Sequence, residues 1–172
     1  QYVSGDREEY PLPYDWYKHM LRPAPQVNHS LSVAGGSEHF KGRISMRYQD
    51  QDGIIPNTNS KINEIRANTD LKVSNRLNFS GDVNYRNVNS LQPQNITEIF
   101  RLMLQNSIFT VPKYSDGQYG AGPQGNNPLL LAEMGGTDKV SNDFINGNLK
   151  GTIELLKGLK FTTQIGALVT NG

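Results

Sequence analysis

The sequence predicts an all-β fold: an antiparallel up-and-down meander of about six long strands, with one short helix in a long loop. Three observations support this prediction. Apolar and polar residues alternate with a period of two over much of the chain, as they do along a strand that has one apolar face. The alternating segments run to roughly 9–13 residues, longer than the ~5–6 typical of soluble sheets. Short turns and longer loops alternate between them.

The segment 40–48 (FKGRISMRY) shows this alternation clearly. Its apolar face carries Phe40, Gly42, Ile44, Met46 and Tyr48. Its other face carries Lys41, Arg43, Ser45 and Arg47, because successive strand residues point to opposite sides. The six predicted strands are 26–34, 39–49, 62–73, 77–86, 143–155 and 159–169.

Two regions lack the alternation. Residues 1–25 hold four of the nine prolines, and we expect an extended lead-in with a helical turn around 15–21. Region 87–142 is expected to be a long loop. It contains a helix near 95–107, since an apolar stripe follows Ile96, Ile99, Phe100, Met103 and Leu104. The predicted organisation is therefore 1–25 lead-in, 26–86 four strands, 87–142 long loop and 143–172 two strands.

The composition argues against several classes of protein, including helical membrane proteins and nucleic-acid-binding proteins. Hydrophobic residues make up 35% of the chain, and no apolar run is long enough for a membrane-spanning helix. The net charge of +1 gives no electrostatic case for nucleic-acid binding. The absence of cysteine excludes disulfides and thiolate metal sites. Because the chain begins with Gln1, we expect a piece of a longer polypeptide.

Two folds fit this alternation, and they differ in what covers the apolar faces of the strands. In a transmembrane barrel they face lipid, the polar faces line a wet lumen, short turns are periplasmic and long loops extracellular. Aromatic residues expected near strand ends match interfacial girdles: Phe40, Tyr48, Phe79, Tyr85 and Phe161. A soluble antiparallel sandwich has the same alternation and stays open. Six strands fall short of the ~8 of the smallest barrels, so a barrel here would be part of a larger one.

A string of short segments resembles one protein family. In order, they are Asp15-Trp16, Arg22-Pro23-Ala24-Pro25, Gln26, Asn28, Leu31-Ser32-Val33, Gly35-Gly36-Ser37-Glu38, and Tyr48 followed by Asp52-Gly53-Ile54-Ile55. The later sequence LKGLKF, which ends at Phe161, fits as well. The family is that of the SusC/RagA-type TonB-linked outer-membrane transporters of Bacteroidetes. The resemblance is strongest over 14–56, persists as a pattern to 86 and is weak over 87–142.

The resemblance implies a fold and a set of partners. The fold is a barrel of about 22 strands with an N-terminal plug, and this chain corresponds to the N-terminal portion of the barrel. Residues 1–25 then join the plug to the barrel, and 87–142 form an extracellular loop. The implied location is the cell outer membrane, and the implied partners are the lipid bilayer, a TonB complex acting through the plug, and a SusD-like surface lipoprotein. The implied substrates are oligosaccharides or peptides.

Nutrient import is therefore the predicted function. A soluble β-sandwich binding module and a small self-contained outer-membrane barrel are the alternatives. In a barrel, the charged residues of the polar faces are lumen-facing candidates: Lys41, Arg43, Arg47, Arg66, Asp70, Asp82 and Arg86. Two roles are open for the cations of segment 40–48. They are expected either to contact substrate or to form ion pairs with plug carboxylates or with Asp70 and Asp82. Ion pairing is the preferred expectation.

Aromatic residues outside the strands are candidates for stacking on sugar rings. Tyr114 and Tyr119 in the long loop are the candidate substrate contacts, and Trp16 in the lead-in is a third aromatic side chain of this kind. Packing within the loop is the alternative role for the two tyrosines, and the more frequent one.

No pattern indicates an enzyme, a cofactor or a metal site. GAGPQG (120–125) fits Gly-x-Gly-x-x-Gly, but that motif needs a strand before it and a helix after it, and Pro123 interrupts a loop here. In an EF-hand alignment of DQDG (50–53), Tyr48 and Asn59 occupy positions that require acids. A solvated turn is the preferred reading of DQDG over a looser cation contact. The three histidines, spaced by ten, lack metal-ligand spacing: His19, His29 and His39.

Overall fold

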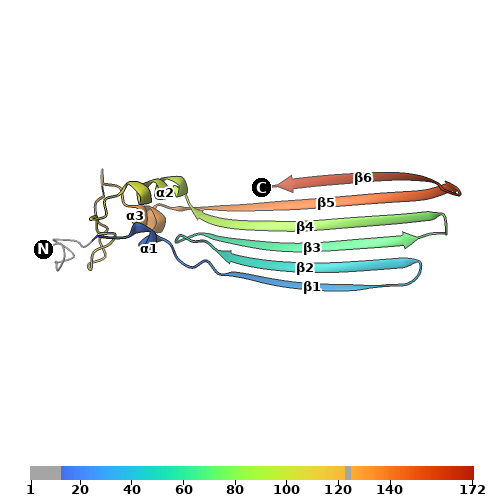
Figure 1. The fold of residues 1–172 in the computed structure, drawn as a ribbon, viewed down its shortest axis with the longest axis horizontal. Coiled ribbons are helices and arrows are strands. Elements are labelled where there is room, and N and C mark those ends of the chain that lie inside the picture. Colours follow the sequence, from blue (N-terminus) through green and yellow to red (C-terminus); the bar gives the residue numbers. More distant parts are fainter. Residues whose placement is uncertain (1–12, 123–124) are drawn as a thin grey trace. The chain divides into compact units, whose positions relative to one another are not determined.

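The computed structural model describes residues 13–122 and 125–172. In chain order its elements are α1 (Trp16–Met20), β1 (Gln26–Gly36), β2 (Phe40–Asp52), β3 (Asn59–Lys72), β4 (Leu77–Pro93), α2 (Ile96–Gln105), α3 (Pro128–Met134), β5 (Thr137–Leu156) and β6 (Leu159–Asn171) (Figure 1). The chain divides into two compact units. The sheet unit comprises 26–50, 61–89 and 140–172. Of the described residues, the helical unit comprises 13–25, 51–60, 90–122 and 125–139.

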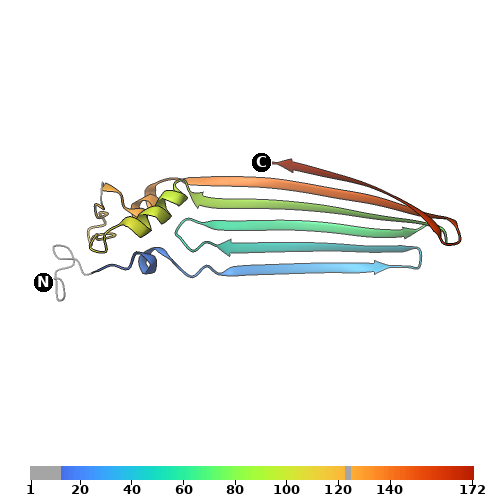
Figure 2. The same cartoon turned by 45° about the horizontal axis from the view of Figure 1, so that its top comes forward.

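The sheet unit is a six-stranded antiparallel meander, which confirms the predicted fold class. The strand order is β1-β2-β3-β4-β5-β6, so every strand lies beside its neighbour in the chain (Figures 1 and 2). In the β5–β6 pair, apolar residues face one another in register, as Ile145 faces Val169 and Leu149 faces Ile165. Such directly opposed apolar pairs are the unit of sheet stabilisation.

All six strands are longer than the alternation predicts, and β4 and β5 exceed their predicted ranges the most. β4 continues past 86 to Pro93 and spans 17 residues, and β5 begins at Thr137 rather than 143 and spans 20 residues. Both ends of the predicted loop 87–142 are therefore strand. The alternation misses these extensions because neither of their faces is consistently apolar in sequence. Their pairing shows in cross-strand contacts, where the Asn87 amide donates to Ser141 Oγ at 3.4 Å and to Asp143 Oδ1 at 2.8 Å.

The helices agree with the sequence in two cases and differ in one. α1 lies within the predicted turn at 15–21, and α2 lies within the predicted helix at 95–107. α3 was expected to be loop, and that expectation is wrong. Its seven residues are too few to show a periodic stripe, but its ends carry local signals. The Asn127 side chain caps it by accepting from Leu129 N at 2.9 Å, and Pro128 begins it.

The buried core of the described residues lies in the helical unit. One cluster joins the lead-in, the β2–β3 connection and both loop helices: Trp16, Met20, Ile55, Ile99, Met103 and Ala132. The Trp16 indole N–H donates to the Ser107 carbonyl at 3.1 Å, and the Asn57 amide donates to the Ala132 carbonyl at 2.9 Å. The lead-in and the β4–β5 connection are therefore held together by packing and by hydrogen bonds.

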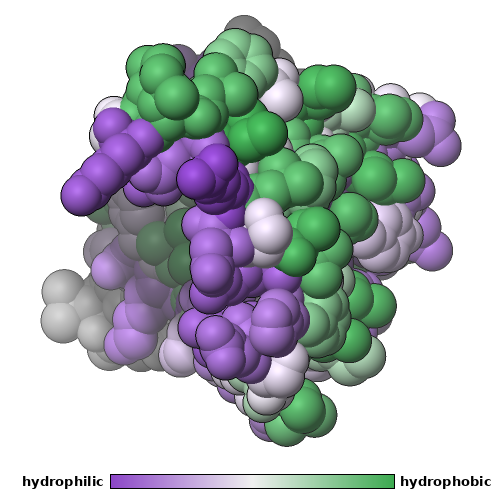
Figure 3. Space-filling view, turned by 90° about the vertical axis from the view of Figure 1, so that its right-hand side faces the viewer, coloured by the Kyte–Doolittle hydropathy of each residue, from purple (hydrophilic) through white to green (hydrophobic). Residues whose placement is uncertain are grey.

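The sheet unit has no comparable apolar core. Most of its large apolar side chains are exposed, from 36% at Ile153 to 72% at Ile165. In the view of Figure 3, hydrophobic side chains gather along one side and hydrophilic side chains along the other. A soluble sandwich needs a second layer over the apolar face, and the sheet unit itself supplies none. No helix in the described ranges has the length and hydrophobicity to span a membrane.

We predict that Trp16→Ala loosens the helical unit. The change removes a side chain that is 3% exposed, and comparable truncations cost about 3–5 kcal/mol. Hydrogen–deuterium exchange over α2 should become at least about tenfold faster, since about 1.4 kcal/mol corresponds to a tenfold change. The matched control is Tyr17→Ala, because Tyr17 is exposed on the same helix. Equal exchange over α2 in both variants would contradict the role assigned to Trp16.

Candidate functional site

The hydrophilic face of the sheet carries all seven lumen-facing candidates. Lys41, Arg43 and Arg47 occupy alternate positions of β2, and the other four occupy alternate positions of β3 and β4. Contacts across strands agree with this placement. Arg43 donates to Ser32 Oγ on β1 and Arg47 to Asn28 Oδ1, both at 3.4 Å.

The structure brings only some of these residues together. Lys41, Arg43 and Asp70 line one pocket. Arg47 donates to Gln49 at 2.6 Å, and Arg66 pairs with Glu64 at 3.1 Å, each on its own strand. The remaining two lie on β4, where Asp82 accepts from Asn148 of β5 at 3.3 Å and Arg86 is exposed. The charged face is therefore a set of local contacts along the strands.

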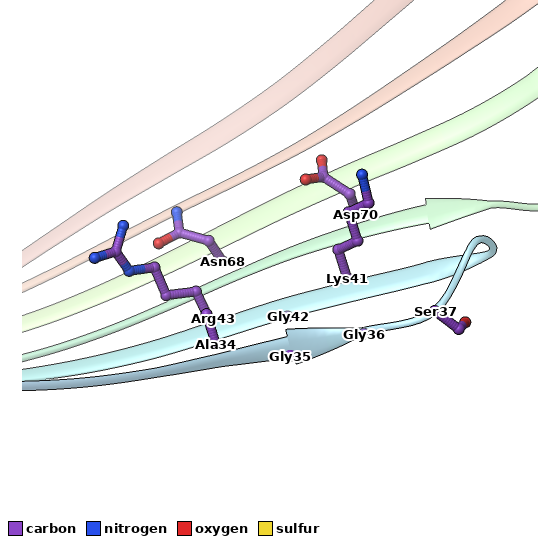
Figure 4. A pocket seen from close by; sticks show the side chains of 9 residues that line it. All are labelled: Ala34, Gly35, Gly36, Ser37, Lys41, Gly42, Arg43, Asn68 and Asp70. Atoms are coloured by element: carbon purple, nitrogen blue, oxygen red, sulfur yellow. The ribbon is translucent and has the colours of Figure 1, made fainter.

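The pocket is an open depression at the β1–β2 hairpin with a volume of about 610 Å³. Figure 4 shows the long side chains of Lys41, Arg43, Asn68 and Asp70 extending to the same side of β2 and β3. The lining residues are Ala34, Gly35, Gly36, Ser37, Lys41, Gly42, Arg43, Asn68 and Asp70. Since four of these nine are glycine or alanine, much of the wall is bare backbone.

The pocket's charges are only partly paired within the described residues. Lys41 and Asp70 line the same pocket, but no ion pair joins them, and Arg43 bonds to a serine. The pairing expected with Asp70 and Asp82 is thus not formed here. Two cations beside one carboxylate and one amide suit a polar or anionic group held by hydrogen bonds. Within the same described ranges, no cluster of three His, Asp or Glu could hold a metal ion.

The three candidate aromatic residues have different surroundings. Trp16 is 3% exposed, so the expectation that its ring is free to stack on a sugar is wrong. Tyr114 is half-buried at a tight turn, where its N–H donates to the Gln118 carbonyl at 2.7 Å. Tyr119 donates from its hydroxyl to Glu133 Oε2 at 2.5 Å. The Lys113 ammonium lies 4.6 Å from the centroid of the Tyr119 ring, so one ring face is covered.

Lys113, Tyr119 and Glu133 form a network that ties the loop to α3. The Lys113 ammonium donates to Glu133 Oε2 at 3.0 Å and to the Tyr119 hydroxyl at 3.2 Å. Sequence reasoning missed Lys113 and Glu133, because α3 was not predicted and nothing local links residues this far apart. The network is part-exposed, so it positions the loop more than it stabilises it.

The network shifts two pKa values in opposite directions. The Tyr119 hydroxyl, and after it the Lys113 ammonium, hold the pKa of Glu133 below its ordinary value. Glu133 and Tyr119 raise the pKa of Lys113. The contribution of Glu133 to stability is present above its ordinary pKa and is lost as pH falls through the lowered one. The contribution of Lys113 to stability is present below the ordinary pKa of Lys113 and is lost as pH rises through its raised pKa. Both contributions are therefore present near neutral pH.

We predict that Tyr119→Phe raises the pKa of Glu133 towards its ordinary value. The change removes the hydroxyl that is the main cause of the lowered pKa and keeps the ring. The measurement is a ¹³C NMR titration of the Glu133 carboxyl. Tyr114→Phe is the control, because the hydrogen bonds of Tyr114 use its backbone. An unchanged Glu133 titration in Tyr119→Phe would show that the hydroxyl bond is not formed in solution.

We predict that Gly36→Ala destabilises the β1–β2 hairpin and that Gly35→Ala does not. A Cβ at Gly36 would lie 2.2 Å from the Phe40 carbonyl oxygen, which is backbone and cannot move freely. A Cβ at Gly35 meets nothing within 4 Å. The two changes are chemically identical, so their effect on the unfolded chain cancels. Urea unfolding should show a loss of about 1–3 kcal/mol for Gly36→Ala alone. Equal urea midpoints for the two variants would contradict the close approach between residue 36 and the Phe40 carbonyl oxygen.

Comparisons with known proteins find similar sequences among TonB-dependent receptors and similar folds in the RagAB structures. No protein-family model matches the chain. Two relatives from Formosa agariphila are 28% identical to it. They are TonB-dependent receptor P26, matched over 76% of this chain and 13% of the relative, and TonB-dependent receptor P3, matched over 96% and 17%. The chain thus spans less than a fifth of the length of either relative.

Solved structures share the fold. The RagAB peptide importer in its closed-closed state matches with a TM-score of 0.65 and 18% identity, over 94% of this chain and 19% of that chain. The RagAB peptide transporter matches with a TM-score of 0.65 and 19% identity, over 92% of this chain and 19% of that chain. The chain is thus similar in sequence to two TonB-dependent receptors and in fold to part of the RagAB structures, which agrees with the resemblance to SusC/RagA-type transporters seen in the sequence.

Proposed function

We propose that this chain forms part of the barrel wall of an outer-membrane nutrient importer. The importer takes up peptides or oligosaccharides, is driven by a TonB complex, and works with a SusD-like surface lipoprotein. The relatives' names support TonB dependence, and the titles of the matched structures, which name a peptide importer, favour peptides. Oligosaccharides remain the second substrate class, from the resemblance of the sequence.

The observation that carries this proposal is the two-sided sheet. Apolar residues occupy alternate positions on all six strands, and most of these are exposed. Exposed contiguous apolar patches beyond a few hundred Å² mark interaction surfaces in soluble proteins, and this face extends over the whole sheet. Acyl chains of a bilayer would cover it, while all backbone groups of the inner strands stay paired. The apolar face is therefore the lipid-facing side of the wall.

The hydrophilic face is the lumen side in this proposal. The seven charged candidates then line the path that a substrate follows: Lys41, Arg43, Arg47, Arg66, Asp70, Asp82 and Arg86. The pocket beside Lys41 and Arg43 offers donors to carboxylates, whether these belong to the plug or to a substrate. Substrate is captured beneath the lipoprotein, the plug rearranges when TonB pulls on it, and the substrate passes along this face.

The connections support one orientation across the membrane. β1–β2, β3–β4 and β5–β6 are joined by short turns, whereas the β2–β3 and β4–β5 connections contribute to the helical unit. Outer-membrane barrels have short periplasmic turns and longer extracellular loops. The helical unit is accordingly extracellular in this proposal. Tyr114 and Tyr119 then belong to the surface that substrate and the lipoprotein approach.

The test is an uptake assay with the full-length receptor in its native cells. Fluorescent oligopeptides and oligosaccharides are supplied separately to cells with and without the receptor gene, and with and without a protonophore. We expect that one of the two substrate classes is taken up, and that its uptake is abolished both by loss of the receptor and by loss of the proton gradient. A lipoprotein encoded nearby should copurify with the receptor. Uptake of both classes that is unaffected by loss of the receptor would overturn the proposal.

A further inference from the structure

Three arginines gather around one glutamate on the hydrophilic face of the sheet. Arg47 lies on β2, Arg66 and Glu64 lie on β3, and Arg86 lies on β4. These four residues are called the arginine cluster below. They come from three strands, and the antiparallel register brings them together.

The register of β2 against β3 places Arg47 directly opposite Glu64. At one end of this strand pair the Lys72 N–H donates to the His39 carbonyl at 2.7 Å. Counting inward from that bond along both strands reaches Arg47 and Glu64 as partners. Because their side chains leave the same face of the sheet, they are neighbours across the ladder.

The register of β3 against β4 places Arg86 on the other side of Glu64. The Val73 N–H donates to the Leu77 carbonyl at 3.0 Å, and the same count along these two strands reaches Glu64 and Arg86 as partners. Neighbouring strands lie ~4.8 Å apart, and alternate residues of one strand lie ~7 Å apart. The Cα atoms of the three arginines therefore lie within about 10 Å of one another.

The cluster carries more positive charge than its own carboxylate neutralises. The half-buried Glu64 carboxylate pairs with the Arg66 guanidinium at 3.1 Å. Arg47 donates to two uncharged amide oxygens, and Arg86 is exposed. Of the ion pairs formed within 13–122 and 125–172, none involves Arg47 or Arg86. Three guanidinium groups and one carboxylate thus leave two positive charges unmatched.

The neighbouring positions on the same face do not balance this excess. The residue opposite Arg66 on β4 is the uncharged Asn84. The next acidic residue along this face of β4 is Asp82, which accepts from Asn148 at 3.3 Å. The cluster is also separate from the pocket beside Lys41, since Lys41 and Arg47 lie six residues apart on β2, or about 20 Å.

The chemistry of the cluster suits carboxylates. A guanidinium group stays charged at every physiological pH, and its planar fork of donors matches the two oxygens of a carboxylate. Positive groups this close repel one another, so an anion held between them relieves the repulsion. In an extended peptide, side chains two or three residues apart are separated by about 7–10 Å, which matches the spacing of the arginines.

We propose that the arginine cluster is a subsite for the acidic side chains of a peptide substrate, so that the importer prefers peptides with two or more carboxylates. This rests on the proposed function and narrows its substrate class. Arg47 and Arg86 bind the carboxylates, and Glu64 holds Arg66 in place. Because Glu64 competes for the same guanidinium groups, binding stays reversible, as passage through a channel requires.

The test compares two fluorescent octapeptides that differ only in charge. One contains two glutamates three positions apart, and the other contains glutamines at the same positions. Binding to the purified full-length receptor in detergent is measured by fluorescence anisotropy, and uptake is measured in cells that carry the receptor. We expect the acidic peptide to bind on the order of tenfold more tightly. This preference should shrink when salt is raised from about 50 mM to about 500 mM, because salt screens exposed charges.

Two single substitutions locate the preference. Arg86→Gln removes a charge of the cluster without breaking an ion pair of the described residues, and it should lower the preference at least about threefold. Arg86→Lys keeps the charge but loses the fork, so it should keep part of the preference. Lys150→Gln is the matched control, because Lys150 is exposed on the same face of β5, about 20 Å away. Uptake of the glutamine peptide shows that each variant is folded and energised.

The possible results separate this inference from the proposed function. A preference that Arg86→Gln lowers and Lys150→Gln leaves unchanged supports the subsite. Equal binding of the two peptides, with uptake of both, overturns the subsite and leaves peptide import intact. An equal loss in both variants assigns the preference to the charge of the whole face and overturns the cluster. If neither peptide is bound or imported, peptide import itself fails, and Arg86-dependent binding of an oligogalacturonate would then identify an acidic sugar as the occupant.

Discussion

The sheet depends on a constraint that the described residues do not satisfy by themselves. Strand backbones pair through hydrogen bonds, and this pairing forces alternate side chains onto one face. That face is apolar on all six strands and has no second layer among the described residues. The hydrophobic contribution that stabilises most sheets must therefore come from outside the described residues, and under the proposed function it comes from lipid. The polar opposite face follows from the same pairing.

The helical unit is organised on the opposite principle. Its stability comes from a small, closed core in which Trp16 from the lead-in meets Ile99 and Met103 from α2. Because the core collects residues from three separate parts of the chain, the connections behave as one folded body and not as independent loops. In the proposed importer, loops that keep a defined shape would favour binding of a substrate and a partner at the outer surface.

At the candidate site, most charged side chains have local hydrogen-bond partners, but some charged groups are not joined in ion pairs. Along the hydrophilic face most charged groups bond within their own strand or to the next one, as Arg66 does with Glu64. Beside Lys41 and Asp70 the wall is backbone, and the two charges stay apart. A surface of this kind can exchange partners, because no strong buried pair has to be broken. By contrast, the loop tyrosine Tyr119 is committed to Glu133 and Lys113, which makes it a positioning residue.

The sequence by itself determined the strands, their two faces and the family resemblance, because a period of two and a local turn are properties of neighbouring residues. It also predicted α2 from its apolar stripe. Only the tertiary structure decided the features that depend on distant partners. These are the extensions of β4 and β5, the burial of Trp16, the capped helix α3 and the approach of Lys113 to Glu133. Each is fixed by contacts between segments far apart in the chain, and no local pattern encodes such contacts.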